Sequence, residues 1–317
     1  MKKVSVIIPC YNEQSNIRPL YEALTRLFES HPQYAWEVVM INDGSTDETL
    51  TEIRRLREHD PRICYVDLSR NFGKERAMLA GFDYATGDCA AIIDADLQHP
   101  PMVIGQMLEL WEQGYQDVYA QRQTRGRESF MRKHLTRLYY RILQRMADTE
   151  VLTNVGDFRL LDRRCIDALR QLRETQRYTK GLYCWIGFRK TFVPFTTDDR
   201  REGHSSFNTW KLFNLAVEGI TSYSTAPLRM ATVMGTVISL LAFVYMIVVL
   251  MKTIIVGEPV PGYPTLICVI LLLGGLQLLS IGIIGEYLSR IFHESKQRPV
   301  YIVNELAVNE RPESARL

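Results

Sequence analysis

Two aspartates one residue apart are the strongest chemical signal in this sequence. The apolar run at residues 90–93 ends directly in Asp94-Ala95-Asp96, and Gln98 and two prolines follow. Such a run is typical of a buried strand, and open α/β sheets bind ligands at the carboxyl ends of their strands. Paired carboxylates suit a divalent cation that also carries waters and substrate phosphates. The alternative for a lone Asp-x-Asp is a solvated acidic turn that caps the next helix.

The rest of the first half of the chain predicts the sheet that would position these aspartates. Helices alternate with short apolar runs, a pattern that predicts a mostly parallel α/β sheet. The predicted strands cover residues 4–9, 37–41, 63–68, 89–93 and 117–120. No glycine-rich dinucleotide fingerprint or P-loop follows any of them.

Further carboxylates follow other predicted strands. Glu13 follows the first strand and Asp43 the second, so both are expected at the same edge as Asp94 and Asp96. Carboxylates gathered at one edge repel one another unless cations compensate, which favours a metal ion and a bound nucleotide over the acidic turn.

Local signals give further expectations. Ser15 can cap a helix that runs to about residue 30, and Ser45 with Glu48 matches the capping box S-x-x-E. Residues 185–195 resemble a further pair of strands.

Composition limits the class of protein. The 317 residues fit one large domain with an appendage, and a net charge of +2 gives no reason to expect a nucleic-acid partner. The six cysteines form no C-x-x-C pair, which indicates reduced thiols in a cytosolic compartment. The first apolar run is too short for a signal peptide.

Two long uncharged stretches predict a membrane hairpin at residues 229–289. Their spans, at about 230–251 and 265–285, each reach the roughly 20 residues that a spanning helix needs. The alternative is a pair of buried helices in a soluble core. Cations flank the hairpin on both outer sides, whereas its connecting loop has only Lys252, offset by Glu258. By the positive-inside rule, both termini and the N-terminal domain would be cytoplasmic.

Two further segments are expected at the membrane surface. Residues 128–148 form a basic amphipathic pattern, which predicts either a helix on an anionic membrane or one packed on the sheet with a solvated basic face. Residues 208–227 resemble an interfacial helix that leads into the first span. In the tail at 290–317, residues 298–303 form a short strand-like run that could pair with a neighbouring chain.

Five blocks in order resemble a known family. They are VSVIIPCYNE, INDGSTDET, LSRNFGKE, IIDADLQHPP and NVGDFRL. The chain resembles family 2 glycosyltransferases with the GT-A fold, and in particular the polyprenyl-phosphate sugar transferases. These include dolichyl-phosphate mannose synthases and, nearer still, bacterial bactoprenol (undecaprenyl-phosphate) glucosyltransferases. The latter share the hairpin, the REGHSSFNTWKL-type loop and the RPVYIV tail.

The resemblance implies a catalytic domain at residues 1–207 and a role for each matching position. Residues that would hold the donor nucleotide are Pro9, Tyr11, Glu13, Asp43, Lys74 and Asp94. Asp94 and Asp96 would hold Mg²⁺ or Mn²⁺ with Gln98 beside them, and Asp157 would be the general base. Arg200, Arg201 and Ser205 would grip the lipid phosphate. The alternatives are a simple positive-inside flank for the two arginines, a turn residue for Asp157, and surface ion pairs for Lys74 and Glu13.

The chemistry questions the role of Asp157 as a base. A phosphate monoester has a second pKa of roughly 6, so the acceptor is largely dianionic at neutral pH and needs little deprotonation. We therefore expect Asp157 mainly to orient the sugar or an acceptor-loop arginine.

The resulting expectation is a metal-dependent, inverting glycosyltransferase in the bacterial inner membrane. It would transfer glucose from UDP-glucose to undecaprenyl phosphate for O-antigen or envelope modification. The resemblance also implies a homotetramer, a separate flippase and a downstream glycosyltransferase. The alternatives are GDP-mannose, UDP-GlcNAc or an aminoarabinose nucleotide as donor, or a non-catalytic nucleotide-binding scaffold for a flippase.

Overall fold

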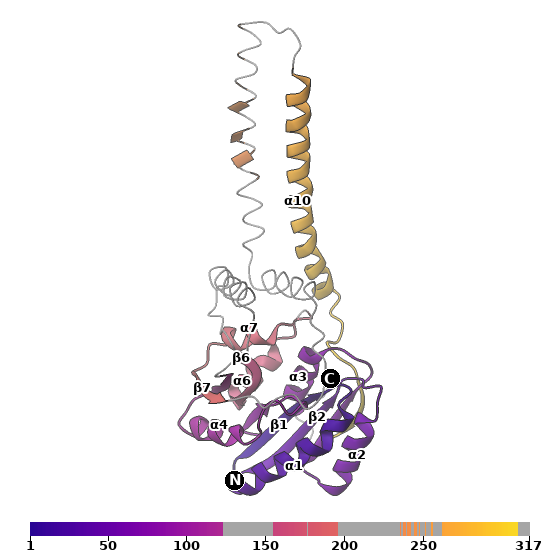
Figure 1. Ribbon diagram of the computed structural model, residues 1–317, viewed down its shortest axis with the longest axis vertical. Helices are drawn as coiled ribbons and strands as arrows, with labels where there is room; N and C mark the ends of the chain where they lie inside the picture. The colour runs from indigo at the N-terminus through magenta and orange to yellow at the C-terminus, as the bar shows by residue number, and fades with distance from the viewer. Residues whose placement is uncertain are drawn as a thin grey trace. The chain divides into compact units, whose positions relative to one another are not determined.

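A single mixed sheet is the centre of the fold (Figure 1). The computed structural model describes residues 1–122, 155–175, 177–195, isolated positions between 235 and 255, and 262–309. Within these residues eight strands pair in the order β7-β5-β6-β4-β1-β2-β3-β8. They are β1 (Lys3–Cys10), β2 (Ala35–Asn42), β3 (Ile63–Leu68), β4 (Cys89–Ile92), β5 (Asp117–Arg122), β6 (Val155–Asp162), β7 (Lys190–Phe195) and β8 (Val303–Ala307).

Strands β4, β1, β2 and β3 run parallel, as β5 and β7 do, whereas β6 is antiparallel to β4 and β5. The mostly parallel α/β class predicted from the alternating pattern is therefore confirmed. The strands of the parallel core are buried along nearly their whole length, as expected for a sheet that is covered on both faces.

Helices cover both faces because successive strand residues point to opposite sides. Ile8 of β1 belongs to the core with α1 (Gln14–Ser30), α2 (Thr49–His59) and α4 (Val103–Glu112). Its neighbour Ile7 belongs to the core with α3 (Lys74–Tyr84), α6 (Arg163–Gln171) and α7 (Thr179–Trp185). Helical spacing accounts for these contacts: α1 buries Ile17, Leu20, Leu24 and Leu27 completely.

Three local predictions were wrong. Ser15 does not cap α1, which begins at Gln14, and the capping box at Ser45 does not form. The Ser45 hydroxyl instead accepts a hydrogen bond from the backbone amide of Asn12 at 3.0 Å, and the amide of Thr49, the first residue of α2, donates to Asp47 Oδ1 at 3.1 Å. Residues 185–195 do not form two strands, because α7 ends at Trp185 and only β7 follows.

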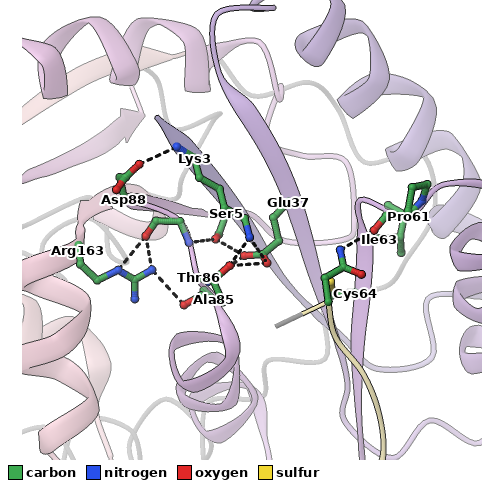
Figure 2. Close-up of polar contacts among 12 residues, drawn as sticks. Lys3, Ser5, Glu37, Pro61, Ile63, Cys64, Ala85, Thr86, Asp88 and Arg163 are labelled. Carbon is green, nitrogen blue, oxygen red and sulfur yellow. Dashed lines mark hydrogen bonds and ion pairs between the residues drawn. The ribbon is translucent and has the colours of Figure 1, made fainter. Parts of the chain in front are cut away.

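A closed polar cluster lies at the amino ends of the central strands (Figure 2). It consists of Lys3, Ser5, Glu37 and Thr86, and is called the amino-edge cluster below. Glu37 is only 3% exposed. Its Oε2 accepts from Ser5 Oγ at 2.6 Å and from the Thr86 amide at 2.9 Å, and its Oε1 accepts from Thr86 Oγ1 at 2.8 Å. Lys3 Nζ completes the cluster, 3.1 Å from Oε1.

The tail returns to the sheet. Strand β8 pairs antiparallel with β3 of the same chain and belongs to the same compact unit, so the strand lies later than the predicted 298–303. The earlier residues form other contacts: the Ile302 carbonyl accepts from the Ser69 amide at 2.9 Å, and the Tyr301 hydroxyl donates to Asp83 at 2.6 Å.

A second unit contains α10 (Tyr263–Ser295), a helix of 33 residues. Across the part of the chain that the structure describes, no helix combines the length and hydrophobicity needed to cross a membrane. The predicted helices at 128–148 and 208–227 and most of the span at 230–251 lie outside the described residues.

Candidate active site

A pocket of about 290 Å³ opens at the carboxyl ends of β1, β2 and β4. This is the edge at which the sequence places its carboxylates. Predicted site residues that line it are Pro9, Tyr11, Glu13, Asp43, Lys74, Asp94 and Asp96. Residues from four separate predicted motifs therefore meet in one cavity. Their individual roles stay predictions.

Asp43 lines the pocket and holds the loop that contains Phe72 and Gly73 through hydrogen bonds to its backbone. It is 2% exposed, and its two carboxylate oxygens accept hydrogen bonds from the amides of Phe72 and Gly73 at 2.7 and 2.8 Å. The adjacent Gly44 has φ +63°, and a Cβ there would lie 2.3 Å from the Arg70 carbonyl carbon. The two loops can approach this closely only because Gly44 has no side chain.

Lys74, the first residue of α3, joins two carboxylates that are distant in sequence. Its Nζ lies 2.6 Å from Asp94 Oδ1 and 2.9 Å from Asp157 Oδ2. The register explains the convergence: β4 and β6 run antiparallel with Ile92 opposite Arg159, so two residues further on Asp94 comes opposite Asp157. Asp157 therefore joins the pocket through Lys74, although it does not line the cavity.

The charge state of this group follows from its contacts. Burial is the largest influence on the pKa of Asp157 and raises it, but Lys74, then Lys180 and Arg159, outweigh burial and hold the pKa below its usual range. Burial likewise opposes the charge of Lys74, yet Asp157 and Asp94 together raise its pKa. Asp157 is thus a carboxylate and Lys74 an ammonium at neutral pH.

The pocket lining is acidic at Glu13, Asp94 and Asp96, whereas Gln98 is not among the lining residues. Burial raises the pKa of Glu13, a hydrogen bond from Asn16 lowers it, and the charges of Asp96 and Asp94 raise it further. Gln98 donates its backbone amide to Asp96 Oδ1 at 3.1 Å, and Leu97 between them has φ +60°, which is strained for a branched side chain. Within the described residues, the buried Nε2 of Gln98 has no hydrogen-bond partner.

These residues fit a divalent cation. The described part of the chain contains no cluster of three or more His, Cys, Asp or Glu side chains arranged to hold a metal. Mg²⁺, however, is usually bound through one or two carboxylates together with substrate phosphates. Asp94 and Asp96 supply two hard oxygen donors, and the mutual repulsion that raises the pKa of Glu13 is what a cation would relieve.

The sequence-based predictions missed one buried group behind Asp157. Arg159 is 1% exposed and donates from Nη1 to Asp117 Oδ2 at 2.9 Å, and its guanidinium lies 3.6 Å from the centre of the Tyr183 ring. The sequence did contain a signal for this residue, because Arg159 is a charged residue inside the apolar run FRLL. Side chains alternate between the two faces of a strand, so Asp157 and Arg159 lie on the same face of β6. The predicted acceptor-loop residues Arg200, Arg201 and Ser205 lie outside the described residues.

The chain belongs to glycosyl transferase family 2, whose model matches residues 5–170, and it is a glycosyltransferase with a Rossmann-like GT-A domain. Residues 226–291 match the family model described as the GtrB C-terminal hairpin. The chain is 43% identical over 304 residues to an uncharacterized glycosyltransferase of Synechocystis sp., covering 96% of this chain and 95% of that protein.

Two further relatives carry more specific names. A prophage bactoprenol glucosyl transferase homolog of Escherichia coli and the bactoprenol glucosyl transferase of Shigella phage SfX are each 40% identical over 301 residues, covering 95% of this chain and 98% of each protein. Among solved structures, residues 1–349 of S. aureus TarS in complex with UDP-GlcNAc match 70% of this chain and 67% of that one, with a TM-score of 0.47 and 16% identity.

Proposed function

We propose that this glycosyltransferase transfers one glucosyl residue from UDP-glucose to undecaprenyl phosphate, with inversion at the anomeric carbon. An oxygen of the acceptor phosphate forms the new bond to the anomeric carbon as the bond to the UDP oxygen breaks, and UDP leaves with that electron pair. The names of the bactoprenol glucosyl transferases, similar over nearly the full chain, support both the sugar and the acceptor.

The observation that carries the proposal is that Lys74, which lines the pocket, pairs with both Asp94 and Asp157. A divalent cation, Mg²⁺ or Mn²⁺, would be held by Asp94 and Asp96 with Gln98 beside them. When bound, it supplies Lewis-acid neutralisation of the charge on the leaving diphosphate. In this proposal the donor binds on the side of Lys74 that faces Asp94. Asp157 lies on the other side of Lys74.

Asp157 acts by positioning in this proposal. Its depressed pKa makes it a weak base at neutral pH, and the acceptor phosphate, with a second pKa of roughly 6, arrives largely deprotonated. The carboxylate instead holds Lys74, and its buried Oδ1, without a hydrogen-bond partner among the described residues, is available to orient a sugar hydroxyl or an arginine.

The lipid acceptor requires a membrane location. The two uncharged stretches and the match to the GtrB C-terminal hairpin support a membrane hairpin, with the catalytic domain and both termini cytoplasmic in the bacterial inner membrane. Arg200, Arg201 and Ser205 would bind the lipid phosphate at the interface, because arginine binds phosphate bidentately. The homotetramer, the separate flippase and the downstream glycosyltransferase remain predictions.

A donor panel tests the function. UDP or GDP release by the full chain is measured with UDP-glucose, UDP-GlcNAc, GDP-mannose and an aminoarabinose nucleotide, each with and without undecaprenyl phosphate and Mg²⁺. We expect release from UDP-glucose only when both additions are present. Asp96→Asn should lower this rate at least ~100-fold, the scale of losing a group that stabilises transition-state charge. Asp167→Asn, an exposed carboxylate on α6, is the matched control. Preference for another donor would overturn the choice of glucose.

A further inference from the structure

The site as described has too little positive charge for the two phosphate-bearing substrates that the proposed function requires. Its carboxylates are Glu13, Asp43, Asp94, Asp96, Asp157 and Glu75. Lys74 already shares its charge between Asp94 and Asp157. A divalent cation would serve the donor side, and the Asp157 side still needs a cation because an anionic acceptor must approach a carboxylate there.

Lys180 is the described cation in a position to supply it. It is the second residue of α7 and is exposed. The preceding residue, Thr179, donates its backbone amide to Glu75 Oε2 at 2.9 Å, and Glu75 follows Lys74 at the start of α3. The start of α7 is therefore fixed against the turn that carries Lys74. No carboxylate of the described residues forms an ion pair with Lys180.

The segment before Lys180 is held by buried polar contacts. Arg177, 7% exposed, donates from Nε to Thr179 Oγ1 at 3.2 Å and from its two terminal nitrogens to the carbonyls of Leu172 and Leu169. Arg76 of α3 donates to the Thr175 carbonyl at 2.8 Å. These contacts hold the backbone next to Lys180, whose side chain is exposed.

Electrostatic coupling agrees with this placement. After burial, which raises the pKa of Asp157, the charge of Lys180 ranks second to Lys74 in lowering it. Lys180 also acts to lower the pKa of Glu75, which burial and Asp157 raise. The ammonium of Lys180 therefore acts on both Asp157 and Glu75.

We propose that Lys180 binds a phosphate oxygen of a substrate beside Asp157, and that this phosphate is the one on the lipid acceptor. The inference rests on the proposed function. The donor diphosphate offers the same chemistry, so the test must separate the two sources. A lysine suits this task because it binds phosphate as a point charge on a flexible stem.

The test compares Lys180→Gln and Lys180→Arg with wild type in initial-rate kinetics, varying undecaprenyl phosphate and the donor separately. We expect Lys180→Gln to raise the KM for the acceptor about 10- to 100-fold, the range for one charge-assisted hydrogen bond. Lys180→Arg should restore most of the loss, which a purely structural role would not do. Lys2→Gln, which removes an exposed lysine at the other edge of the sheet, should leave both KM values unchanged.

Binding of UDP to the same variants, measured by calorimetry, separates the phosphate sources. An unchanged Kd for UDP with a raised acceptor KM supports the acceptor. A weakened Kd for UDP with an unchanged acceptor KM would assign Lys180 to the donor diphosphate and overturn the proposal as stated. Unchanged values for both would overturn any phosphate contact. If wild type transfers no sugar to undecaprenyl phosphate, the proposed function itself fails, and the UDP Kd still reports on the donor side of Lys180.

Discussion

Two lysine–carboxylate groups lie at opposite edges of the same sheet, and they are built differently. In the amino-edge cluster, both oxygens of Glu37 accept hydrogen bonds from Ser5 and Thr86, and Lys3 is one partner among several (Figure 2). At the carboxyl edge, Asp157 depends on Lys74, and its buried Oδ1 has no hydrogen-bond partner within the described ranges. Both carboxylate oxygens of Glu37 thus have hydrogen-bond partners, whereas Asp157 Oδ1 can still accept a hydrogen bond from a ligand.

The pKa values express the same difference. Burial raises the pKa of both carboxylates, and both end below their usual range. For Glu37 the opposing influences are hydrogen bonds from Ser5 and Thr86, with the charge of Lys3 last. For Asp157 the main opposing influence is the charge of Lys74. Neutral donors stabilise a fold without attracting ligands, whereas a carboxylate held by a single cation can exchange that partner during a reaction.

The largest expected effect is on activity at the carboxyl edge. Lys74→Gln should lower kcat/KM at least ~100-fold, because a preorganised charge at the site is lost and Asp94 and Asp157 are left facing each other. Lys3→Gln, the matched change at the other edge, should leave kcat/KM nearly unchanged. Steady-state assays of both variants check this. An equal loss of kcat/KM in the two variants would contradict the claim that only the carboxyl-edge group takes part in catalysis.

Stability should respond in the opposite order. Glu37→Gln replaces an acceptor with a donor that faces the Thr86 amide, so we expect it to lower the free energy of unfolding by about 1–3 kcal/mol. Urea unfolding of the full chain in detergent measures this change, and the kcat of the folded variant should equal that of wild type. A fall in kcat without a shift in the unfolding midpoint would contradict a structural role.

A smaller effect is expected in acid. The folded-state pKa of Glu37 lies below 4.5, so its contribution to stability is fully present above about pH 4.5 and is lost as the pH falls through the folded-state value. The difference in unfolding free energy between wild type and Glu37→Gln should therefore shrink below pH 4.5. A difference that stays constant down to pH 3 would show that ionisation of Glu37 contributes nothing.

The sequence predicted the elements better than it predicted their partners. Strand β3 occupies the predicted residues 63–68 because its apolar, β-branched run is short and clearly bounded. The capping box failed because Ser45 bonds to Asn12, 33 residues away, and no local pattern records such a contact. Periodicity could not place β8 beside β3 either, since that pairing joins residues more than 230 positions apart.

The site shows the same limit. Parallel-sheet geometry predicted that Asp94 lies at the same edge as Glu13 and Asp43, whereas Lys74 and Asp157 were predicted as site residues only through the family resemblance. The contact of Lys74 with both carboxylates depends on the antiparallel register of β6 against β4, which spacing does not reveal. Lys180 was missed because its position depends on Arg177, Arg76 and Glu75 rather than on a motif.

The central claim is that Asp157 is an ionised positioning residue and not the base that activates the acceptor. The direct test is the pH dependence of kcat/KM for wild type and Asp157→Asn with undecaprenyl phosphate as acceptor. We predict a uniform drop in the variant, with the low-pH limb of wild type retained near the phosphate pKa of roughly 6. Selective loss of that limb in Asp157→Asn would contradict the account and assign proton removal to Asp157.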